Sequence, residues 1–251
     1  MLFMYYAMRK KTILKAACAT IFAVMLCAGC YDLGLEPSVP PPMEGTFVDR
    51  RDGHVYKKVQ IGRQIWMAEN LSYEADGSVC PYVQNYFTSV DPDYYCAVYG
   101  RLYDWSTAMN GENRSNANPS GVEGICPVGW HLPSDAEWSE LIGYVGINAS
   151  VKLRAVNFGE TGRPGGRDIY GFSALAGGLA SELSTNFFTN IGDAPPYFWD
   201  ATRTGYWWSS TEEESNGTKA WGRVLTTGNT EVYTMEYDKH YMFSVRCVHD
   251  Y

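Results

Sequence analysis

A helix with a clear beginning and end lies in the middle of this sequence. Ser134 is followed three residues later by Glu137, the spacing of a capping box, in which the serine hydroxyl accepts from the Glu137 N–H and the glutamate accepts from the Ser134 N–H. Pro133 keeps the entering chain extended, and Gly146 lies where helices commonly end. The apolar residues in between recur at the spacing of one helix face, and they are Trp138, Leu141, Ile142 and Val145. The sequence therefore predicts a helix over 134–145 that packs one stripe against a core.

The composition indicates a chain dominated by strands and loops. Aromatic residues make up 15% of the 251 residues, and there are 25 glycines. Aromatic residues are enriched in strands, while recognisable long helices are scarce here. One domain is the simplest arrangement for this length. We predict an α+β domain with short antiparallel strands, one or two helices and long glycine-rich loops.

The first residues resemble the leader of an exported lipoprotein. Residues 8–11 read Met-Arg-Lys-Lys, an apolar run over 16–28 is too short to span a bilayer, and small residues precede Cys30. This order predicts a lipoprotein signal peptide over 1–29, with Cys30 as the lipidated first residue of the mature protein. The alternatives are an ordinary signal peptide followed by a coincidental cysteine, or a single membrane anchor.

A spacer follows the predicted lipid anchor. Residues 30–45 contain four prolines and little apolar periodicity, which indicates an extended tether. The folded domain is expected to span 46–251. We expect the chain to be exported and held by lipid in a bacterial outer membrane, on the periplasmic or the cell-surface side.

The charge of the chain argues against nucleic acid as a partner. The formal net charge is −8, and four of the 20 basic residues lie in the leader. Without the leader, 16 basic residues remain against 28 acidic ones, a net charge of −12. Phosphate binding needs clustered Lys and Arg, so we expect no nucleic-acid partner.

Four cysteines remain after processing: Cys80, Cys96, Cys126 and Cys247. An even set in an exported protein predicts disulfides, with three connectivities open. Cys80 and Cys96 flank a polar, aromatic loop, which favours a local bridge. Cys126 then pairs with Cys247 and fastens the last strand to the segment that enters the helix. The alternatives, a zinc site or a catalytic thiol, lack the CxxC pair and spacings that such sites use.

Two regions show the pattern of antiparallel strands. Near the start, residues 47–49 and 55–61 flank a hairpin signal at 51–54, and 61–67 hold a second turn at Gly62. Near the end, short runs separated by turn residues fit a meander over 206–211, 220–225, 231–237 and 243–248. Alternate residues of the last run share one face, namely Phe243, Val245 and Cys247.

Shorter signals fill the regions between these strands. Asp104 can cap a short helix that carries Trp105, Ala108 and Met109, and residues 151–155 add one more turn of helix. Long polar or glycine-dense connections are expected over 80–96, 111–124, 157–178 and 186–205.

Six motifs together resemble one known family. They lie at residues 52–71, 99–105, 126–138, 170–175, 207–212 and 243–248. In this order they look like a member of the Fibrobacter succinogenes major paralogous domain family, whose members are mostly exported lipoproteins of uncharacterised role. One departure is Met242, where the family usually has glycine. More distantly, residues 131–138 and the closing strand are similar to C-type lectin-like and formylglycine-generating enzyme folds. That similarity implies a compact lectin-like α+β domain whose terminal strands meet, but no activity.

The residues that could carry chemistry have simpler structural roles. We expect His131 to be a packed histidine at the helix entrance, and Asp135 and Glu137 to cap the helix and complement its dipole. Arg246 is expected to pair with a buried acid or carbonyl. Calcium is kept as an alternative, with ligands among Glu212, Glu213, Glu214, Asp193 and Asp200, although a solvated acidic turn explains these residues better. We predict no catalytic residues, no metal site and no cofactor.

An aromatic surface is the best candidate for ligand binding. Its residues are Tyr206, Trp207, Trp208, Trp221 and Tyr233. Because adjacent strand residues point to opposite faces, either Trp207 or Trp208 is expected to meet solvent or a loop groove, unless long loops cover both. Exposed aromatic rings stack well on sugar rings.

These observations predict a non-catalytic, lipid-anchored envelope domain for binding or adhesion. Its expected ligand is a polysaccharide or another surface protein. The first alternative is an enzyme related to the formylglycine-generating fold, for which Cys126 and Cys247 are the candidate reactive thiols. The second alternative is a purely structural envelope protein.

Overall fold

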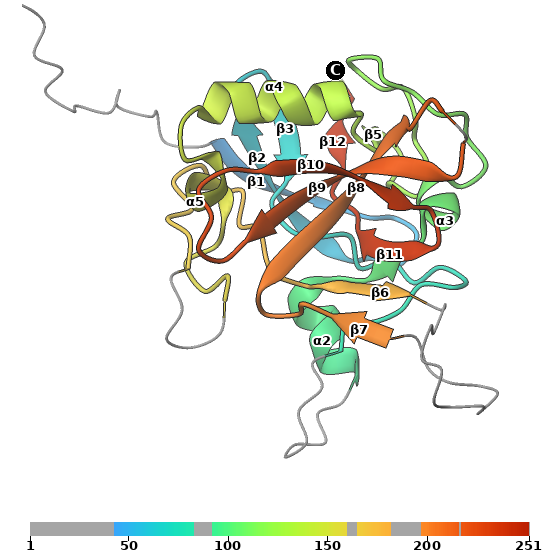
Figure 1. Ribbon diagram of the computed structural model, residues 1–251, viewed down its shortest axis with the longest axis horizontal. Helices are drawn as coiled ribbons and strands as arrows, with labels where there is room; N and C mark the ends of the chain where they lie inside the picture. The colour runs from blue at the N-terminus through green and yellow to red at the C-terminus, as the bar shows by residue number, and fades with distance from the viewer. Residues whose placement is uncertain (1–42, 83–91, 160–164, 182–196, 216, 251) are drawn as a thin grey trace, which may run out of the picture. The chain divides into compact units, whose positions relative to one another are not determined.

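The structure is a computed structural model that describes residues 43–82, 92–159, 165–181, 197–215 and 217–250 (Figure 1). The chain divides into two compact units, Met1–Val39 and Pro40–Tyr251, and all described residues belong to the second. The predicted signal peptide, Cys30 and most of the predicted spacer therefore lie outside the described residues. The first strand begins at Met43, three residues before the predicted start of the domain.

The first sheet joins the beginning of the domain to its end. It contains, in spatial order, β1 (Met43–Val48), β2 (Val55–Ile61), β3 (Gln64–Met67), β12 (Val248–His249) and β5 (Trp130–His131). The two predicted hairpins are confirmed, since β1 pairs with β2 and β2 with β3, all antiparallel. Gly53 and Gly62 adopt positive φ angles of 80° and 62° in the connecting turns, a conformation that favours glycine.

Within the described residues, the second sheet has seven strands. Six follow the order β10 (Tyr233–Asp238), β9 (Lys219–Thr226), β8 (Thr204–Glu212), β11 (Tyr241–Ser244), β6 (Leu179–Ser181) and β7 (Tyr197–Trp199). The remaining strand, β4 (Leu102–Tyr103), pairs with β11. The meander prediction is correct for the antiparallel strands β8, β9 and β10.

The meander prediction is wrong for the last run of the chain. Strand β11 does not pair with β10 but lies parallel to β8, where Ser244 is opposite Trp207. The strand ends at Ser244, and residues Val245 to Cys247 cross to the first sheet, where the Cys247 carbonyl accepts from the Met67 N–H at 3.0 Å. Burial explains this path, because Phe243, Val245 and Cys247 all belong to one hydrophobic cluster.

Four helices are seen in the described part of the domain. The helix α4 (Asp135–Val145) has Ser134 as N-cap with a complete capping box and ends at Gly146, as predicted. The short helix α3 (Trp105–Met109) is capped by Asp104, also as predicted. Helix α5 (Ala149–Leu153) begins two residues before its predicted start, and α2 (Pro92–Tyr99) was not predicted. No helix in the described ranges is long and apolar enough to cross a membrane.

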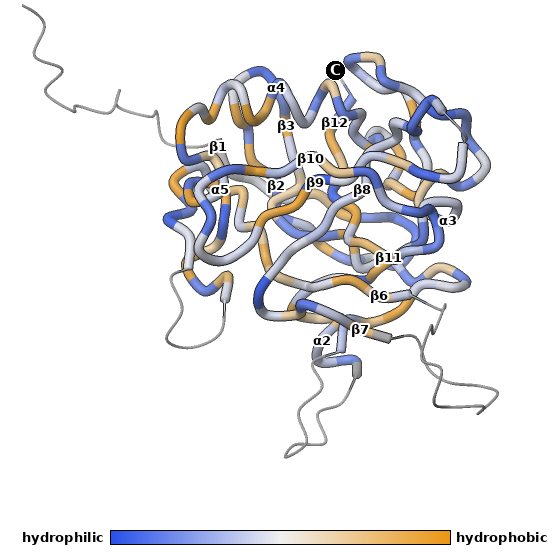
Figure 2. The backbone as a smooth tube through the Cα atoms, viewed as in Figure 1, coloured by the Kyte–Doolittle hydropathy of each residue, from blue (hydrophilic) through white to orange (hydrophobic). Residues whose placement is uncertain are grey.

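Two aromatic groups occupy opposite faces of β8. On one face Trp208 stacks on Phe243 with ring centroids 4.2 Å apart. On the other face Trp207 lies 6.4 Å from Trp138 of α4, which in turn packs on Trp66 of β3 at 4.7 Å. Figure 2 shows hydrophobic segments in the strands of both sheets and mainly hydrophilic loops near α3.

Both predicted disulfides are present. Cys80 and Cys96 are bonded across a sequence separation of 16 residues, and Cys126 and Cys247 across 121. The longer bridge joins the segment before β5 to the end of the crossing segment before β12. In the chain-entropy view, closing a loop of this length restricts the unfolded chain by nearly 5 kcal/mol, an order-of-magnitude figure before native strain is subtracted.

Candidate binding cleft

The structure corrects the aromatic surface expected from the sequence. Trp207 and Trp208 are 0% exposed, and Tyr206 is buried as well. The two tryptophans do point to opposite faces of β8, but both faces are covered, one by α4 and the other by the core around Phe243. Their indole N–H groups also have internal acceptors, Asn70 Oδ1 for Trp207 and the Tyr103 carbonyl for Trp208, each at 2.9 Å. These three aromatic residues stabilise the fold and cannot contact a ligand.

Trp221 and Tyr233, the other two predicted aromatic residues, do not come together. In the register of β9 and β10, Trp221 lies opposite Glu236, whereas Tyr233 lies opposite Val224. Directly opposed residues share a face and neighbours in a strand alternate, so Trp221 and Tyr233 point to opposite faces of the sheet. A single surface containing both is therefore excluded.

Trp221 remains as a half-buried residue at the side of a cleft. The cleft has a volume of about 510 Å³. It is lined by the loop after α3 on one side and by the end of β8 and the turn after it on the other, with Arg114, Ser115, Asn116, Thr211, Glu212, Glu213, Glu214 and Trp221 as lining residues. An indole ring beside hydroxyl, amide, guanidinium and carboxylate groups is a mixed lining that suits a polar ligand with an apolar face.

A bulge in β8 gives the cleft its shape. The pairing of β8 with β9 is regular up to Trp208 opposite Gly222 and resumes at Glu212 opposite Ala220, so residues 209–211 are displaced opposite Trp221. The Ser209 hydroxyl donates to the Trp221 carbonyl at 2.8 Å, and Thr211 Oγ1 donates to the Ser115 carbonyl at 2.9 Å. Bulges redirect side chains in this way next to functional sites.

The loop that forms the opposite wall is fastened to the start of α4. Asn116 Oδ1 accepts from the Ala136 N–H at 3.1 Å, and the Ala117 carbonyl accepts from the Ser134 hydroxyl at 2.6 Å. Farther along the loop, Asn118 donates to Glu140 Oε2 at 2.7 Å. The wall is thus held by the same capped helix that the sequence predicts.

Glu212 is the charged centre of the cleft rim. One carboxylate oxygen accepts from Arg114 at 2.9 Å across the cleft, and the other is ion-paired with Lys239. The hydrogen bond from Lys239 is the main cause that lowers the pKa of Glu212 below its usual value, with the charges of both cations adding to it. Glu212 is therefore ionised at neutral pH and ties the two walls together.

Two of the acids named for the calcium alternative accept hydrogen bonds from neighbouring hydroxyl groups. Glu213 accepts from the Ser215 hydroxyl at 2.6 Å, and Asp200 accepts from the Tyr206 hydroxyl at 2.8 Å. Asp193 lies outside the described residues. Within the ranges that the structure describes, no three His, Cys, Asp or Glu side chains are grouped as metal ligands.

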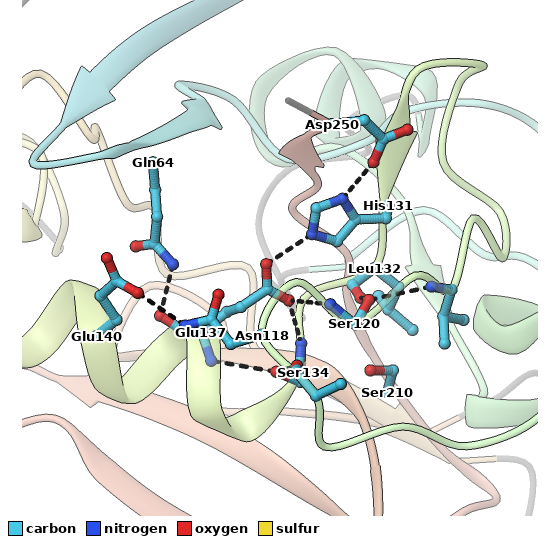
Figure 3. Close-up of polar contacts among 12 residues, drawn as sticks. Gln64, Asn118, Ser120, His131, Leu132, Ser134, Glu137, Glu140, Ser210 and Asp250 are labelled. Carbon is cyan, nitrogen blue, oxygen red and sulfur yellow. Dashed lines mark hydrogen bonds and ion pairs between the residues drawn. The ribbon is translucent and has the colours of Figure 1, made fainter.

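The predicted packed histidine is the centre of a buried polar network (Figure 3). His131 Nε2 lies 2.7 Å from Glu137 Oε1, and His131 Nδ1 lies 2.6 Å from Asp250 Oδ1. The other oxygen of Glu137 accepts from the N–H groups of Ser134 and Ser120, at 3.0 and 3.1 Å. Glu137 thereby connects the helix cap, the loop that carries Ser120 and the end of the chain.

This network surrounds an imidazole with two carboxylates, which favours its protonated form. A neutral imidazole has one N–H, so two ionised carboxylate partners favour the imidazolium form, which donates to both. Burial alone lowers the pKa of His131, but the hydrogen bonds and charges of Glu137 and Asp250 outweigh it and raise the pKa above its usual value. Because both ring nitrogens are engaged by carboxylates, neither can act as base toward a hydroxyl nucleophile.

Arg246 is a second buried cation, and its partners are amides. Its guanidinium donates to Asn70 Oδ1 at 2.7 Å and to the Phe172 carbonyl, and lies 4.3 Å over the Phe172 ring. Complete burial lowers its pKa to about 9, so it stays charged at neutral pH. The expectation that Arg246 pairs with a buried acid or carbonyl is confirmed by the Phe172 carbonyl.

No described cysteine is available as a nucleophile. Cys80, Cys96, Cys126 and Cys247 are all in disulfides. The pair that an enzyme of the formylglycine-generating type would need is thus oxidised and buried, with Cys247 in the core cluster.

Sequence reasoning missed the residues that make the cleft wall. Arg114, Ser115 and Asn116 lie in a polar loop that the pattern identifies only as exposed. Their contacts with β8 depend on the bulge at 209–211, which no local sequence signal marks. The Asn- and Ser-rich composition of the loop is the one hint that it offers hydrogen-bonding groups.

Comparison with known proteins places the chain in a family. The geometry defines an α+β domain with two sheets, a disulfide that fastens its end to its middle, and a polar cleft beside a tryptophan. The family model of the Fibrobacter succinogenes major domain matches residues 59–249, and the chain belongs to this family. No match was found among curated proteins or among solved structures.

Proposed function

We propose that this protein is a non-catalytic envelope lipoprotein that binds carbohydrate in the cleft beside Trp221. The observation that carries the proposal is the half-buried indole of Trp221 at a hollow of about 510 Å³ lined by polar side chains. A sugar ring has an apolar face that packs on an aromatic ring and hydroxyl groups that exchange hydrogen bonds with amides and charged groups. Asn116 and Glu214 are placed in the lining to make such bonds.

The proposal includes the setting in which the cleft works. The leader motif ending at Cys30 supports export and a lipid anchor in the outer membrane, with the domain on the periplasmic or the cell-surface side. The fold is proposed to be C-type lectin-like. That view is supported by β12, which pairs with β3 and so brings the first and last strands into one sheet.

The binding experiment compares two tryptophans that are both partly exposed. The purified protein is titrated calorimetrically with a panel of oligosaccharides and with polysaccharide extracted from bacterial envelopes. Trp221→Ala is expected to weaken binding about tenfold or more, a loss of about 1.4 kcal/mol or more. Trp199→Ala is the matched control, because Trp199 is 45% exposed on β7 and does not line the cleft. Equal affinity of the two variants, or no binding to any glycan, contradicts the proposal.

The anchor is tested separately from the cleft. Cells that express the chain are labelled with a palmitate analogue and fractionated. Label in the protein and its recovery in the outer membrane are expected, and Cys30→Ser is expected to lose both. Unlabelled wild-type protein contradicts the lipid anchor but leaves the cleft proposal standing.

The enzyme alternative predicts that Cys126 and Cys247 are free thiols rather than a disulfide. Titration of free thiols in the unreduced, unfolded protein is expected to find none from Cys126 and Cys247, because they are bonded to each other. Two reactive thiols at these positions would favour an enzyme over a binding domain.

A further inference from the structure

The strand β10 forms a long edge of the second sheet. It pairs with β9 through six consecutive residues without a bulge, from Tyr233 opposite Val224 to Asp238 opposite Lys219. Among the described strands none pairs with its other side, because β10 is the first in the spatial order of the sheet. Its outward backbone N–H and C=O groups are therefore a template for another strand.

The side chains of β10 lack two of the features that commonly protect an edge. The strand Tyr233–Asp238 contains neither lysine nor proline, the residues that most often block pairing. Instead, Tyr233 and Met235 are 42% and 48% exposed, and they share one face because they alternate along the strand. The other six-residue edge strand, β1, has Gly45 in its interior and exposes Val48 only at its end.

The charge of this edge indicates what can pair with it. Residues 230–238 include Glu231, Glu236 and Asp238 and no basic residue. The lysine that follows, Lys239, is already ion-paired with Glu212. A second copy of this chain would place the same acids against each other, and the chain as a whole carries a net charge of −8. A strand of another protein that carries Lys or Arg side chains would not be repelled by these acids.

We propose that the outer edge of β10 binds an extended, basic segment of another protein, which adds a strand to the second sheet. The backbone of the segment pairs with β10, its apolar side chains cover Tyr233 and Met235, and its alternate Lys or Arg side chains meet Glu236 on the other face. A further basic residue at the end of the segment meets Glu231, which lies just before β10. The apolar part of this surface is distinct from the glycan cleft, since Tyr233 and Met235 point to the face opposite Trp221, whereas Glu236 lies on the Trp221 face. It gives the protein a protein-binding site in addition to the proposed carbohydrate site.

The test uses peptides that differ in charge alone. The full protein is titrated with a peptide of alternating Lys and Val and with its Glu and Val counterpart, and amide hydrogen exchange is followed in parallel. The basic peptide is expected to bind at least tenfold more tightly and to slow exchange within residues 233–238. The acidic peptide is expected to leave exchange there unchanged.

A charge-reversed variant makes the test specific. Glu231→Lys together with Glu236→Lys is expected to reverse the preference, so that the acidic peptide binds more tightly. The control is Glu112→Lys together with Glu123→Lys, which changes the net charge equally on exposed residues away from β10 and is expected to keep the wild-type preference. Equal peptide binding by both variants, protection outside 233–238, or self-association of the wild-type protein through β10 overturns the proposal.

Discussion

Trp207 and Trp221 lie on neighbouring strands and point to the same face of the second sheet. One is fully covered, whereas the other borders a cleft. Trp207 lies opposite Arg223, which is two residues from Trp221 on β9, so all three side chains share a face. Trp207 is covered by Trp138 of α4 and is 0% exposed. Trp221 lies opposite the bulge in β8 and borders the cleft.

The difference shows that coverage by α4 and the loops, not the strand pattern, decides which aromatic residue can meet a ligand. Helix α4 covers the face beside Trp207, and Asp135 in its first turn anchors it to Arg223 at 2.6 Å. Beyond that point the loop around Asn116 approaches β8 but leaves a hollow beside Trp221. The predictions that follow probe each side of this contrast.

The largest loss of unfolding free energy is expected at Trp207, which α4 covers. Trp207→Ala should lower the free energy of unfolding by about 3–5 kcal/mol, since it leaves a cavity under α4 and removes a hydrogen bond to Asn70 Oδ1. Urea unfolding followed by circular dichroism measures this change. A loss below about 1 kcal/mol would mean that Trp207 is not covered as described.

Removal of the Cys126–Cys247 disulfide should cause the second largest loss of unfolding free energy. Replacement of Cys126 and Cys247 by alanine is expected to cost about 2–5 kcal/mol, because the unfolded chain regains the freedom of a long loop. The same unfolding experiment applies, with the Cys80→Ala and Cys96→Ala pair as control. The control should lose less, because its loop spans 16 rather than 121 residues. Equal losses contradict the importance of the long bridge.

The protonation of His131 is expected to make a smaller, pH-dependent contribution to the free energy of unfolding. His131 has a folded-state pKa above 6.5, so its protonated form stabilises the fold fully below about pH 6.5, and this contribution is lost as pH rises through the folded-state pKa. Unfolding free energies measured from about pH 6 to about pH 9 should therefore fall more steeply for the wild type than for His131→Gln. The same slope in both proteins would exclude a proton held by Glu137 and Asp250.

The smallest effect on stability is expected at Trp221, which borders the cleft. Trp221→Ala should lower the free energy of unfolding by less than Trp207→Ala does, because Trp221 is partly exposed beside the cleft while Trp207 is fully buried. Thermal unfolding compared with Trp207→Ala measures the contrast. A loss as large as that of Trp207→Ala would make Trp221 a core residue and remove it from the proposed site.

The parts of the fold that local chemistry determines could be predicted from the sequence. The capping box at Ser134 and Glu137 predicts α4, and the cysteine spacing predicts both bridges. Positions that depend on distant segments could not be predicted. Strand β11 lies beside β8, where Phe243 stacks on Trp208. Helix α2 occupies part of a loop with no clear helical signal.

The candidate site was predictable only in its residue type. The sequence predicts that aromatic residues of the closing strands border a ligand site, and of the predicted residues Trp221 lines the cleft. It cannot reveal that α4 covers Trp207, or that a bulge places Thr211 against Asn116 at 3.1 Å, because both depend on long-range packing.

The most direct test of the central claim follows the indole N–H signals of the protein by nuclear magnetic resonance during titration with a binding glycan. The signal of Trp221 is expected to shift, while the signals of Trp207 and Trp208, whose N–H groups donate to Asn70 and to the Tyr103 carbonyl, stay in place. A glycan that binds and leaves the Trp221 signal unmoved would contradict the account.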